Sequence, residues 1–349
     1  MSPGKFQSAN SSYPRFVTWL STIQCNLQCI HCCTQSMCDA QAEPLTTEEA
    51  QGCIDEFADC GVQGMFLSGG EPLLKKDLLE IISYATDAGI AMFMCTNGIL
   101  LSEKRTRDLK QAGLKGIYVG VEGINPSAQD RFYGGPGGTL KKKLEGIRES
   151  VQAGIHTGID FCCTADNYTQ LPEVISLAQN LGVNTFSLRR FVPVGRGETN
   201  RDDLWMDPEC YQEVIDSYCV HILHPEKIEF MSLDPLVTAR LSEIKPLSFY
   251  ESPCNIGAWI AMTHSGDLVP CPYLPLSVGN IREESFSDIC KNSTVLADLK
   301  NKTLLKGRCG TCELRYNCGG CRASAYNVTG DYLAEDPNCW KVAHVEEGQ

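Results

Sequence analysis

The chain lacks any long apolar run. None of its 349 residues fall in a stretch of about 18 consecutive apolar residues, the length that a membrane-spanning helix needs. The first residues, Met-Ser-Pro-Gly-Lys-Phe, contain no apolar leader core. We therefore expect a cytoplasmic protein without membrane spans. Hydrophobic residues make up 43% of the chain, which is ample for a buried core.

The chain also has little positive charge. Its 30 Lys and Arg residues face 43 Asp and Glu residues, which gives a formal net charge of −13. Binding to a phosphate backbone needs basic stripes, so we expect no nucleic-acid partner. The basic run Lys141-Lys142-Lys143 stands at the start of a predicted helix, and we interpret it as a solvent-exposed face.

Cysteine, in contrast, is abundant, with 20 residues. Disulfides would suit a short secreted protein, so metal clusters are the better interpretation here. Cys25, Cys29 and Cys32 follow the apolar run 16–20 with the spacing C-x3-C-x2-C. Three thiolates on one loop can hold three irons of a [4Fe–4S] cluster and leave the fourth iron open for a small molecule. A zinc site is the alternative, because Cys-x2-Cys pairs are typical of zinc.

Strand and helix patterns alternate from residue 16 to about residue 190. We expect strands at 16–22, 64–68, 91–95, 117–122, 156–163 and 184–190, and helices at 47–60, 75–89, 102–112, 139–153 and 170–181. Thr46 and Glu49 supply a capping signal for the first helix. Glycines 61, 89, 113, 154 and 182 stand just past the helix ends, where a left-handed cap favours glycine. Such alternation predicts an α/β fold with parallel strands and right-handed crossovers.

The polar motifs of this half all fall at the carboxyl ends of the predicted strands, where such sheets bind ligands. They are the cysteine loop, Ser68-Gly69-Gly70-Glu71-Pro72, Thr96-Asn97-Gly98, Glu122-Gly123, Thr164 and Arg189-Arg190. The sequence therefore predicts one site at the mouth of the sheet.

The cysteine loop after a first strand, together with 68–72 after a second, resembles the radical S-adenosylmethionine (SAM) superfamily and its GGEP motif. The resemblance implies a partial (β/α)6 barrel, a SAM-binding [4Fe–4S] cluster on the three cysteines, and SAM chelating the open iron. Reduction by a flavodoxin- or ferredoxin-type donor would then give a 5′-deoxyadenosyl radical. Gly69, Gly70, Glu71 and Pro72 would hold the SAM amino group, and Asn97, Glu122 and Arg189 are further expected cofactor contacts. His31 stands where many members carry an aromatic residue.

The second half of the chain carries another cysteine series that resembles the SPASM extension of radical SAM enzymes. By that resemblance, Cys309, Cys312, Cys318 and Cys339 would hold one complete [4Fe–4S] cluster. Cys254, Cys271 and Cys321 would hold another, without an obvious fourth cysteine, so we expect one or two auxiliary Fe–S clusters. Structural zinc knuckles are the alternative. We expect most other cysteines, including Cys33, Cys95 and Cys162, to be core residues. The expected domains are an N-terminal arm (1–15), the barrel (16–235) and the extension (236–349).

Three stretches, 191–197, 278–282 and 318–323, resemble enzymes of the alternative heme and heme d1 pathways. This implies a tetrapyrrole substrate whose carboxylates would be bound by Arg190 and Arg196, since arginine binds carboxylates in bidentate geometry. The expected reaction is oxidative decarboxylation of propionates or removal of acetates, which the sequence does not distinguish. The alternatives are a peptide maturase or sulfatase-type enzyme of the same superfamily, and a non-catalytic Fe–S or zinc-binding protein.

Overall fold

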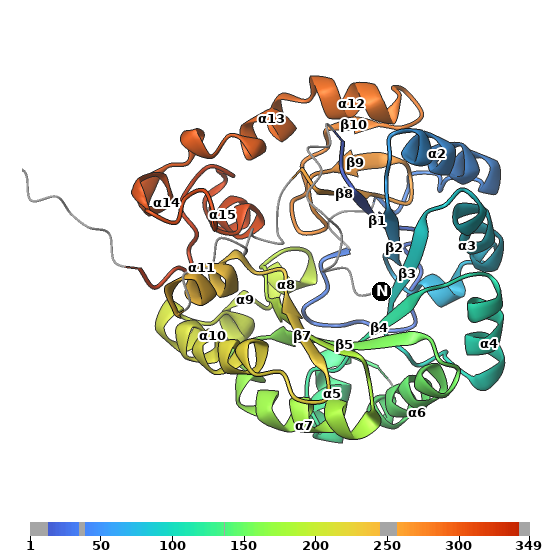
Figure 1. The fold of residues 1–349 in the computed structure, drawn as a ribbon, viewed down its shortest axis with the longest axis horizontal. Helices are drawn as coiled ribbons and strands as arrows, with labels where there is room; N and C mark the ends of the chain where they lie inside the picture. Colours follow the sequence, from blue (N-terminus) through green and yellow to red (C-terminus); the bar gives the residue numbers. More distant parts are fainter. Residues whose placement is uncertain (1–12, 35–38, 136, 245–256, 342–349) are drawn as a thin grey trace, which may run out of the picture.

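The computed structural model describes residues 13–34, 39–135, 137–244 and 257–341. Ten of its strands form one curved sheet in the order β10-β9-β8-β1-β2-β3-β4-β5-β6-β7 (Figure 1). The strands are β1 (Phe16–Leu20), β2 (Gly64–Ser68), β3 (Ala91–Thr96), β4 (Gly116–Gly120), β5 (His156–Cys163), β6 (Thr185–Arg190), β7 (Glu229–Ser232), β8 (Trp259–Met262), β9 (Asp267–Val269) and β10 (Gly279–Asn280). The strands from β8 to β7 run parallel, which confirms the predicted α/β class.

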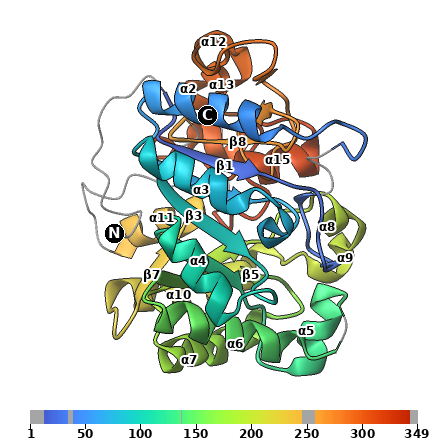
Figure 2. The same ribbon diagram turned by 90° about the vertical axis from the view of Figure 1, so that its right-hand side faces the viewer.

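Helices cover the outer face of the curved sheet (Figures 1 and 2). The predicted helices are present as α2 (Thr47–Asp59), α3 (Leu78–Asp87), α4 (Glu103–Gln111), α6 (Thr139–Gln152) and α7 (Leu171–Leu181). The others are α5 (Pro126–Tyr133), α8 (Arg196–Thr199), α9 (Arg201–Leu204), α10 (Pro208–Leu223), α11 (Pro235–Ile244), α12 (Phe286–Asn292), α13 (Thr294–Lys300), α14 (Gly307–Thr311) and α15 (Arg322–Thr329), with 3-10 turns at Pro72–Leu74, Tyr168–Gln170 and Lys302–Leu304. No helix in these described ranges is long and apolar enough to cross a membrane.

Local sequence signals set the helix ends as expected. Thr46 accepts a hydrogen bond from the Glu49 N–H, while the Glu49 carboxylate accepts one from the Thr46 N–H, which completes a capping box. The five glycines predicted past the helix ends all have positive φ, from 68° at Gly154 to 103° at Gly113. A side chain would be strained in this conformation, which is why glycine stands there.

The strands bury one face against the helices and turn the other toward the inside of the curve. Val17, Trp19, Met65 and Leu67 belong to the core beneath the helices and are at most 1% exposed. The alternate face of the sheet instead carries an aromatic cluster made of Phe16, Phe66, Phe93, Tyr118 and Trp259. In this cluster the Phe66 and Phe93 rings stack 4.8 Å apart. Part of the inside of the sheet is therefore an aromatic wall.

The C-terminal part of the chain extends the same sheet. β8 pairs in parallel with β1, with Trp259 opposite Phe16, and β9 and β10 continue in antiparallel pairs. The predicted boundary between 235 and 236 stays a prediction, but strands on both sides of it share one hydrogen-bonded sheet. Sequence patterns missed β7 and β8 because four residues are too few to display a period.

Candidate active site

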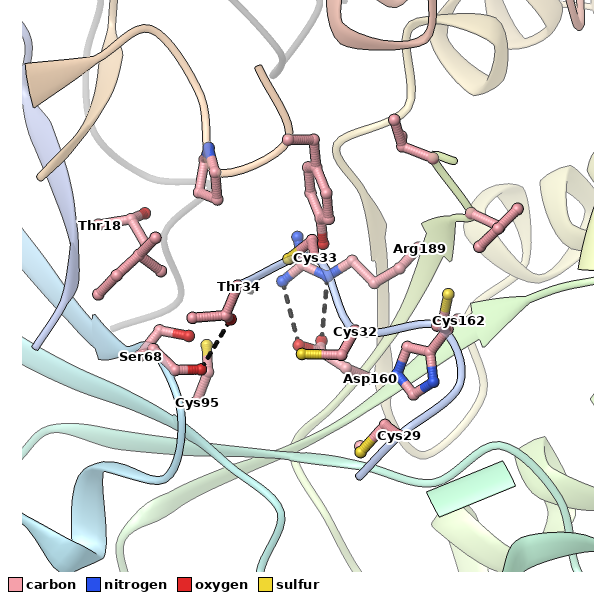
Figure 3. Close-up of a pocket in the computed structure, with 18 of the residues that line it drawn as sticks. Thr18, Cys29, Cys32, Cys33, Thr34, Ser68, Cys95, Asp160, Cys162 and Arg189 are labelled. Atoms are coloured by element: carbon pink, nitrogen blue, oxygen red, sulfur yellow. Dashed lines mark hydrogen bonds and ion pairs between the residues drawn. The ribbon is translucent and has the colours of Figure 1, made fainter. Parts of the chain in front are cut away.

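A cavity of about 1350 Å³ opens at the carboxyl ends of the parallel strands. Its lining comes from the cysteine loop, from the loops after β2 and β3, from the inner faces of β4, β5 and β6, and from the loop after β9. Figure 3 shows part of this lining, with Cys29, Cys32, Asp160 and Arg189 among the labelled side chains. Most of the predicted strand-end motifs meet at this mouth, but Thr164 lies outside the lining, fully buried and donating its hydroxyl hydrogen to the Asn167 side-chain oxygen.

The cysteine loop is held in place by two helices that the sequence patterns did not predict. Backbone N–H groups of Gln28 and Ile30 donate to the carbonyl oxygens of Tyr133 and Phe132 at the end of α5. At the start of α8, the Arg196 N–H donates to the Cys32 carbonyl oxygen at 3.0 Å, and the Arg196 Nε donates to the Cys29 carbonyl oxygen at 2.9 Å. Helix α5 had a readable signal, because Asn125-Pro126 is a typical helix start.

The three thiols of this loop lie close enough to influence one another electrostatically. Burial raises the pKa of both Cys25 and Cys29, and the neighbouring Cys32 raises it further. The raised pKa values favour the thiol forms of Cys25 and Cys29, so binding of a metal cluster to these two residues would release protons. Three cysteines on one loop that faces a cavity fit the three-thiolate site implied by the sequence. Burial also lowers the pKa of His31 to about 3, so its ring, packed 4.4 Å from Phe132, is neutral.

The GGEP segment packs directly against the cysteine loop. The Gly70 N–H donates to the Thr22 carbonyl oxygen at 2.6 Å, and the Glu71 N–H donates to the Gln24 carbonyl oxygen at 2.7 Å. A Cβ at Gly70 would lie 2.1 Å from the Gln24 oxygen, and one at Gly69 would lie 2.5 Å from the Thr22 oxygen. Only glycines permit this approach, so the two glycines dock one motif on the other.

The Glu71 side chain is fully buried and faces the protein rather than the cavity. Its carboxylate accepts hydrogen bonds from the Thr96 hydroxyl at 2.7 Å, the Asn97 N–H at 2.9 Å and the Leu73 N–H at 3.1 Å. Burial raises the pKa of Glu71, and these three donors oppose the increase. This geometry favours a bracing role that ties the GGEP segment to the loop after β3; the contact with the SAM amino group stays a prediction.

We expect Glu71→Ala to weaken SAM binding about tenfold or more by releasing this brace. It should also lower the free energy of unfolding by about 2–5 kcal/mol, because it leaves three donors without their acceptor. Glu71→Gln keeps one side-chain oxygen as an acceptor, in an amide. It should therefore lose less SAM affinity and less stability than Glu71→Ala. Denaturant unfolding and calorimetric SAM titration measure the two effects. Weakened SAM binding with unchanged stability would favour direct contact with SAM instead.

Asn97, Pro72 and Glu122 take different positions around the mouth. Pro72 begins a 3-10 turn and is buried. The Asn97 side chain donates to the Asn26 side-chain oxygen at 2.7 Å, beside the cysteine loop.

Glu122 is nearly buried at the cavity wall, and its Oε2 has no hydrogen-bond partner among the described residues. Burial raises its pKa to about 7, with Lys143 opposing. A buried acceptor without a partner fits a ligand that donates a hydrogen bond.

Lys143 contradicts the expected solvent-exposed lysine run. Lys141 and Lys142 are exposed, but Lys143 is 0% exposed. Its Nζ donates to the Gly120 carbonyl oxygen at 2.8 Å and lies 2.9 Å from the centre of the Tyr133 ring. Burial lowers its pKa to about 8, and Glu122 and Cys29 oppose the decrease. The sequence pattern does indicate that Lys143 is buried, because Lys143 lies on the same helical face as the buried Leu140 and Ile147.

The three candidate arginines, Arg189, Arg190 and Arg196, differ in the hydrogen bonds that they already make within the protein. Arg190 is buried between Asp234 and Asp336, with four hydrogen bonds of 2.7–2.9 Å. This geometry favours a structural bridge over the predicted substrate contact. Arg196 supports the cysteine loop. Arg189 points into the cavity (Figure 3) and is paired only with Asp160 among the described residues.

Several cysteines expected in the core line the cavity instead. Cys33, Cys95 and Cys162 are all part of its wall (Figure 3). Cys95 and Cys162 lie on the inward faces of β3 and β5. Core residues of these strands would instead face the helices. An alternating strand pattern does not reveal which face meets the helices when both faces are apolar.

The C-terminal cysteines separate into two places. Cys309 is electrostatically coupled to Cys312, Cys318 and Cys339, so these four thiols are gathered together. Cys271 and Cys321 instead line the cavity and pack on one small apolar cluster. This division follows the two predicted ligand sets, while Cys254 lies outside the described residues. Within those residues, no three Cys, His, Asp or Glu side chains are close enough to hold one metal ion.

Asp336 connects both cysteine groups to the barrel. Its carboxylate binds Arg190 of β6 and accepts from the Cys321 N–H at 2.7 Å, while its own N–H donates to the Cys309 Sγ at 3.4 Å. The buried Arg322 places a second donor 3.6 Å from the same sulfur. N–H donors around a cysteine sulfur are common at Fe–S clusters, where they help to set the reduction potential. The residues present therefore fit an auxiliary cluster.

Family comparisons match both halves of the chain. The Radical SAM superfamily matches residues 19–181, and an iron–sulfur cluster-binding domain, SPASM, matches residues 254–319. Among solved structures, the crystal structure of Streptococcus suis SuiB bound to its precursor peptide SuiA has a TM-score of 0.76 at 16% identity, covering 95% of this chain and 76% of that one. At this identity the likeness concerns the fold.

Relatives with similar sequences cover almost the whole chain. An AdoMet-dependent heme synthase of Methanosarcina barkeri is 34% identical over 345 residues, with 95% of this chain and 97% of the relative covered. The heme synthase of Nitratidesulfovibrio vulgaris is 29% identical, with 93% and 92% covered. A PqqA peptide cyclase of Rhizobium meliloti is also 29% identical, with 91% and 84% covered.

Proposed function

Because the chain belongs to the radical SAM superfamily and carries its SPASM iron–sulfur extension, we propose that it oxidatively decarboxylates propionate side chains of an iron porphyrin to vinyl groups. The observation that carries this proposal is the 34% identity to a heme synthase across 97% of that relative's length. Heme carries vinyl groups, so a heme synthase relative favours propionate decarboxylation over acetate removal.

The cavity supports a flat, apolar substrate with carboxylates. Small-molecule sites usually enclose roughly 300–1,000 Å³, and this one, at about 1350 Å³, has room for SAM beside a large second ligand. Phe66, Tyr118, Trp259 and Tyr273 contribute aromatic walls. Such walls exclude water from a macrocycle and offer it ring faces for stacking.

Cys25, Cys29 and Cys32 would hold a cluster that, together with SAM, would supply a 5′-deoxyadenosyl radical for removing a hydrogen atom from the propionate. The propionate would then lose CO₂ and one electron to become a vinyl group, and SAM would be converted to methionine and 5′-deoxyadenosine. Cys271 and Cys321 line the cavity, and together with Cys254 they would hold the group that accepts the electron. We further propose a reduced flavodoxin or ferredoxin as the electron donor.

The protein's own residues orient and protect this chemistry. Gly69 and Gly70 fix the SAM-binding loop against the cysteine loop, and α5 and α8 hold the cysteine loop rigid. The buried Lys143 amine and Glu122 carboxyl are both electrostatically coupled to the Cys29 thiol. Rigid placement of reacting groups supplies much of the rate enhancement in such sites.

An anaerobic assay tests this function. Reconstituted enzyme with SAM, dithionite and iron coproporphyrin III, a porphyrin with four propionates and no vinyl groups, should yield vinyl products by mass spectrometry. One 5′-deoxyadenosine should form per vinyl group, and no product should form without SAM. The second candidate, peptide modification, rests on the similarity to the peptide cyclase. Peptide-dependent 5′-deoxyadenosine without a porphyrin product would favour it.

A further inference from the structure

One charged pair stands out on the inner wall of the curved sheet. Asp160 on β5 and Arg189 on β6 point toward each other across the cavity floor (Figure 3). Both side chains retain some access to the cavity, with exposures of 18% and 23%. Around them lie aromatic rings and thiols, and the neighbouring Arg190–Asp234 ion pair also lines the cavity.

The contact between the two residues is loose. Arg189 Nη2 donates to the Asp160 Oδ2 at 3.3 Å, and Nε lies 3.3 Å from Oδ1 without forming a hydrogen bond. Charge-assisted bonds between guanidinium and carboxylate are usually about 2.7–2.9 Å long. Arg190, one residue further along, has that shorter geometry with both of its aspartates. Asp160 therefore orients the Arg189 guanidinium but leaves some of its N–H donors unused.

Donor capacity distinguishes Arg189 from the other arginines at the mouth. A guanidinium offers five N–H donors in a planar fork. Arg190 directs three nitrogens at Asp234 and Asp336, and Arg196 directs its Nε at the cysteine loop. The Nη1 of Arg189 makes no hydrogen bond with any residue in the described part of the chain. One edge of this fork can thus receive a bidentate carboxylate.

The surroundings of this edge suit the end of a propionate. Tyr273, from the loop after β9, and Cys33 both line the cavity, and Tyr273 lies within electrostatic range of Cys33 and of Arg189. Asp160 compensates the buried positive charge when no ligand is present, since an unpaired buried ion is costly. A carboxylate on an otherwise apolar ligand would pair with Arg189 there, while the rest of the ligand would contact the aromatic walls.

We propose that Arg189 binds a carboxylate of the substrate and that Asp160 holds the guanidinium in position for it. This inference rests on the proposed function, which makes the carboxylate a propionate of the porphyrin. Arg189 is then a specificity-determining residue for substrate, rather than the SAM contact expected from the sequence, and Arg190 is a structural bridge.

Binding measurements with two probes test this assignment. Iron coproporphyrin III and its tetramethyl ester are titrated into the clustered protein by Soret absorbance, and labelled SAM is measured separately by equilibrium dialysis. Arg189→Gln should weaken binding of the acid about 10- to 100-fold, which corresponds to losing a charged hydrogen-bonded pair. It should leave ester and SAM binding unchanged. Arg131→Gln, at an exposed ion pair, is the matched control.

The double variant Arg189→Gln/Asp160→Asn guards against misfolding, because it removes both buried charges together. It should show the same selective loss of acid binding. A parallel fall in SAM affinity, or unchanged binding of the acid by both variants, would overturn the assignment while wild-type turnover leaves the proposed function intact. Wild-type protein that binds and converts no porphyrin would instead refute the proposed function, and the assignment with it.

Discussion

Replacing Cys25, Cys29 and Cys32 together with alanine should reduce 5′-deoxyadenosine formation to background. These three thiols share one loop at the cavity mouth and influence one another electrostatically. Without them no cluster can hold SAM there, whereas the C-terminal cysteines lie on other elements. Iron content should fall by about four atoms per chain, and the remaining iron should stay with the C-terminal sites. Anaerobic iron analysis and chromatography of the nucleoside product measure both quantities.

A reciprocal variant is the control. Replacing Cys309 and Cys312 with alanine should also remove about four irons, because Cys309 is at the centre of the gathered C-terminal thiols. SAM cleavage without substrate should survive in that variant, while product formation falls. Full 5′-deoxyadenosine production by the triple variant would refute the assignment of the radical site. Zinc in place of the C-terminal iron would restore the zinc interpretation.

Lys143→Met should lower SAM cleavage by at least about 100-fold. The ammonium is completely buried beside Glu122, Glu71, Cys29 and Cys25, all of which favour its charged form. Methionine keeps an unbranched, flexible side chain only one heavy atom shorter, but it removes the positive charge that opposes the ionised cluster ligands. Losing one partner of a buried charged group costs about 3–5 kcal/mol, which supports an effect of this size.

The neighbouring residue offers a matched control for this substitution. Lys142→Met lies on the same helix, one position away, with an exposed side chain. It should cleave SAM at the wild-type rate. Iron analysis separates loss of the cluster from loss of SAM binding in the Lys143 variant. Wild-type cleavage by Lys143→Met would show that the buried ammonium has no part in the site.

Sequence patterns predicted the elements whose causes are local. The capping box at Thr46 and the glycine past each helix end depend on residues within one turn, so the helix limits could be read directly. Most of the strand-end motifs met at one mouth because parallel strands carry their carboxyl ends to the same edge.

Features that depend on distant partners could not be read in this way. Arg190 resembles its neighbour Arg189 in sequence, and only the fold brings Asp336, 146 positions away, to its guanidinium. Lys143 appears in a run of three lysines, and its burial depends on the Tyr133 ring and the Gly120 carbonyl. Glu71 likewise looks like a ligand in the motif, and only the fold shows that donors on the next loop also bind its carboxylate.

The anchoring of the cysteine loop by α8 has a consequence for the order of events during synthesis. The Cys32 and Ile30 carbonyls are bonded by Arg196 and Asn200, and the Gly195 backbone packs against the Cys32 oxygen. At about 5–20 residues per second, a ribosome reaches these anchors roughly 10 to 30 seconds after it has made the cysteines. During that interval the loop can contact the GGEP segment and α5, which are made earlier, but it lacks the anchors of α8. The cysteine loop is therefore fully anchored only after the later part of the barrel has been made.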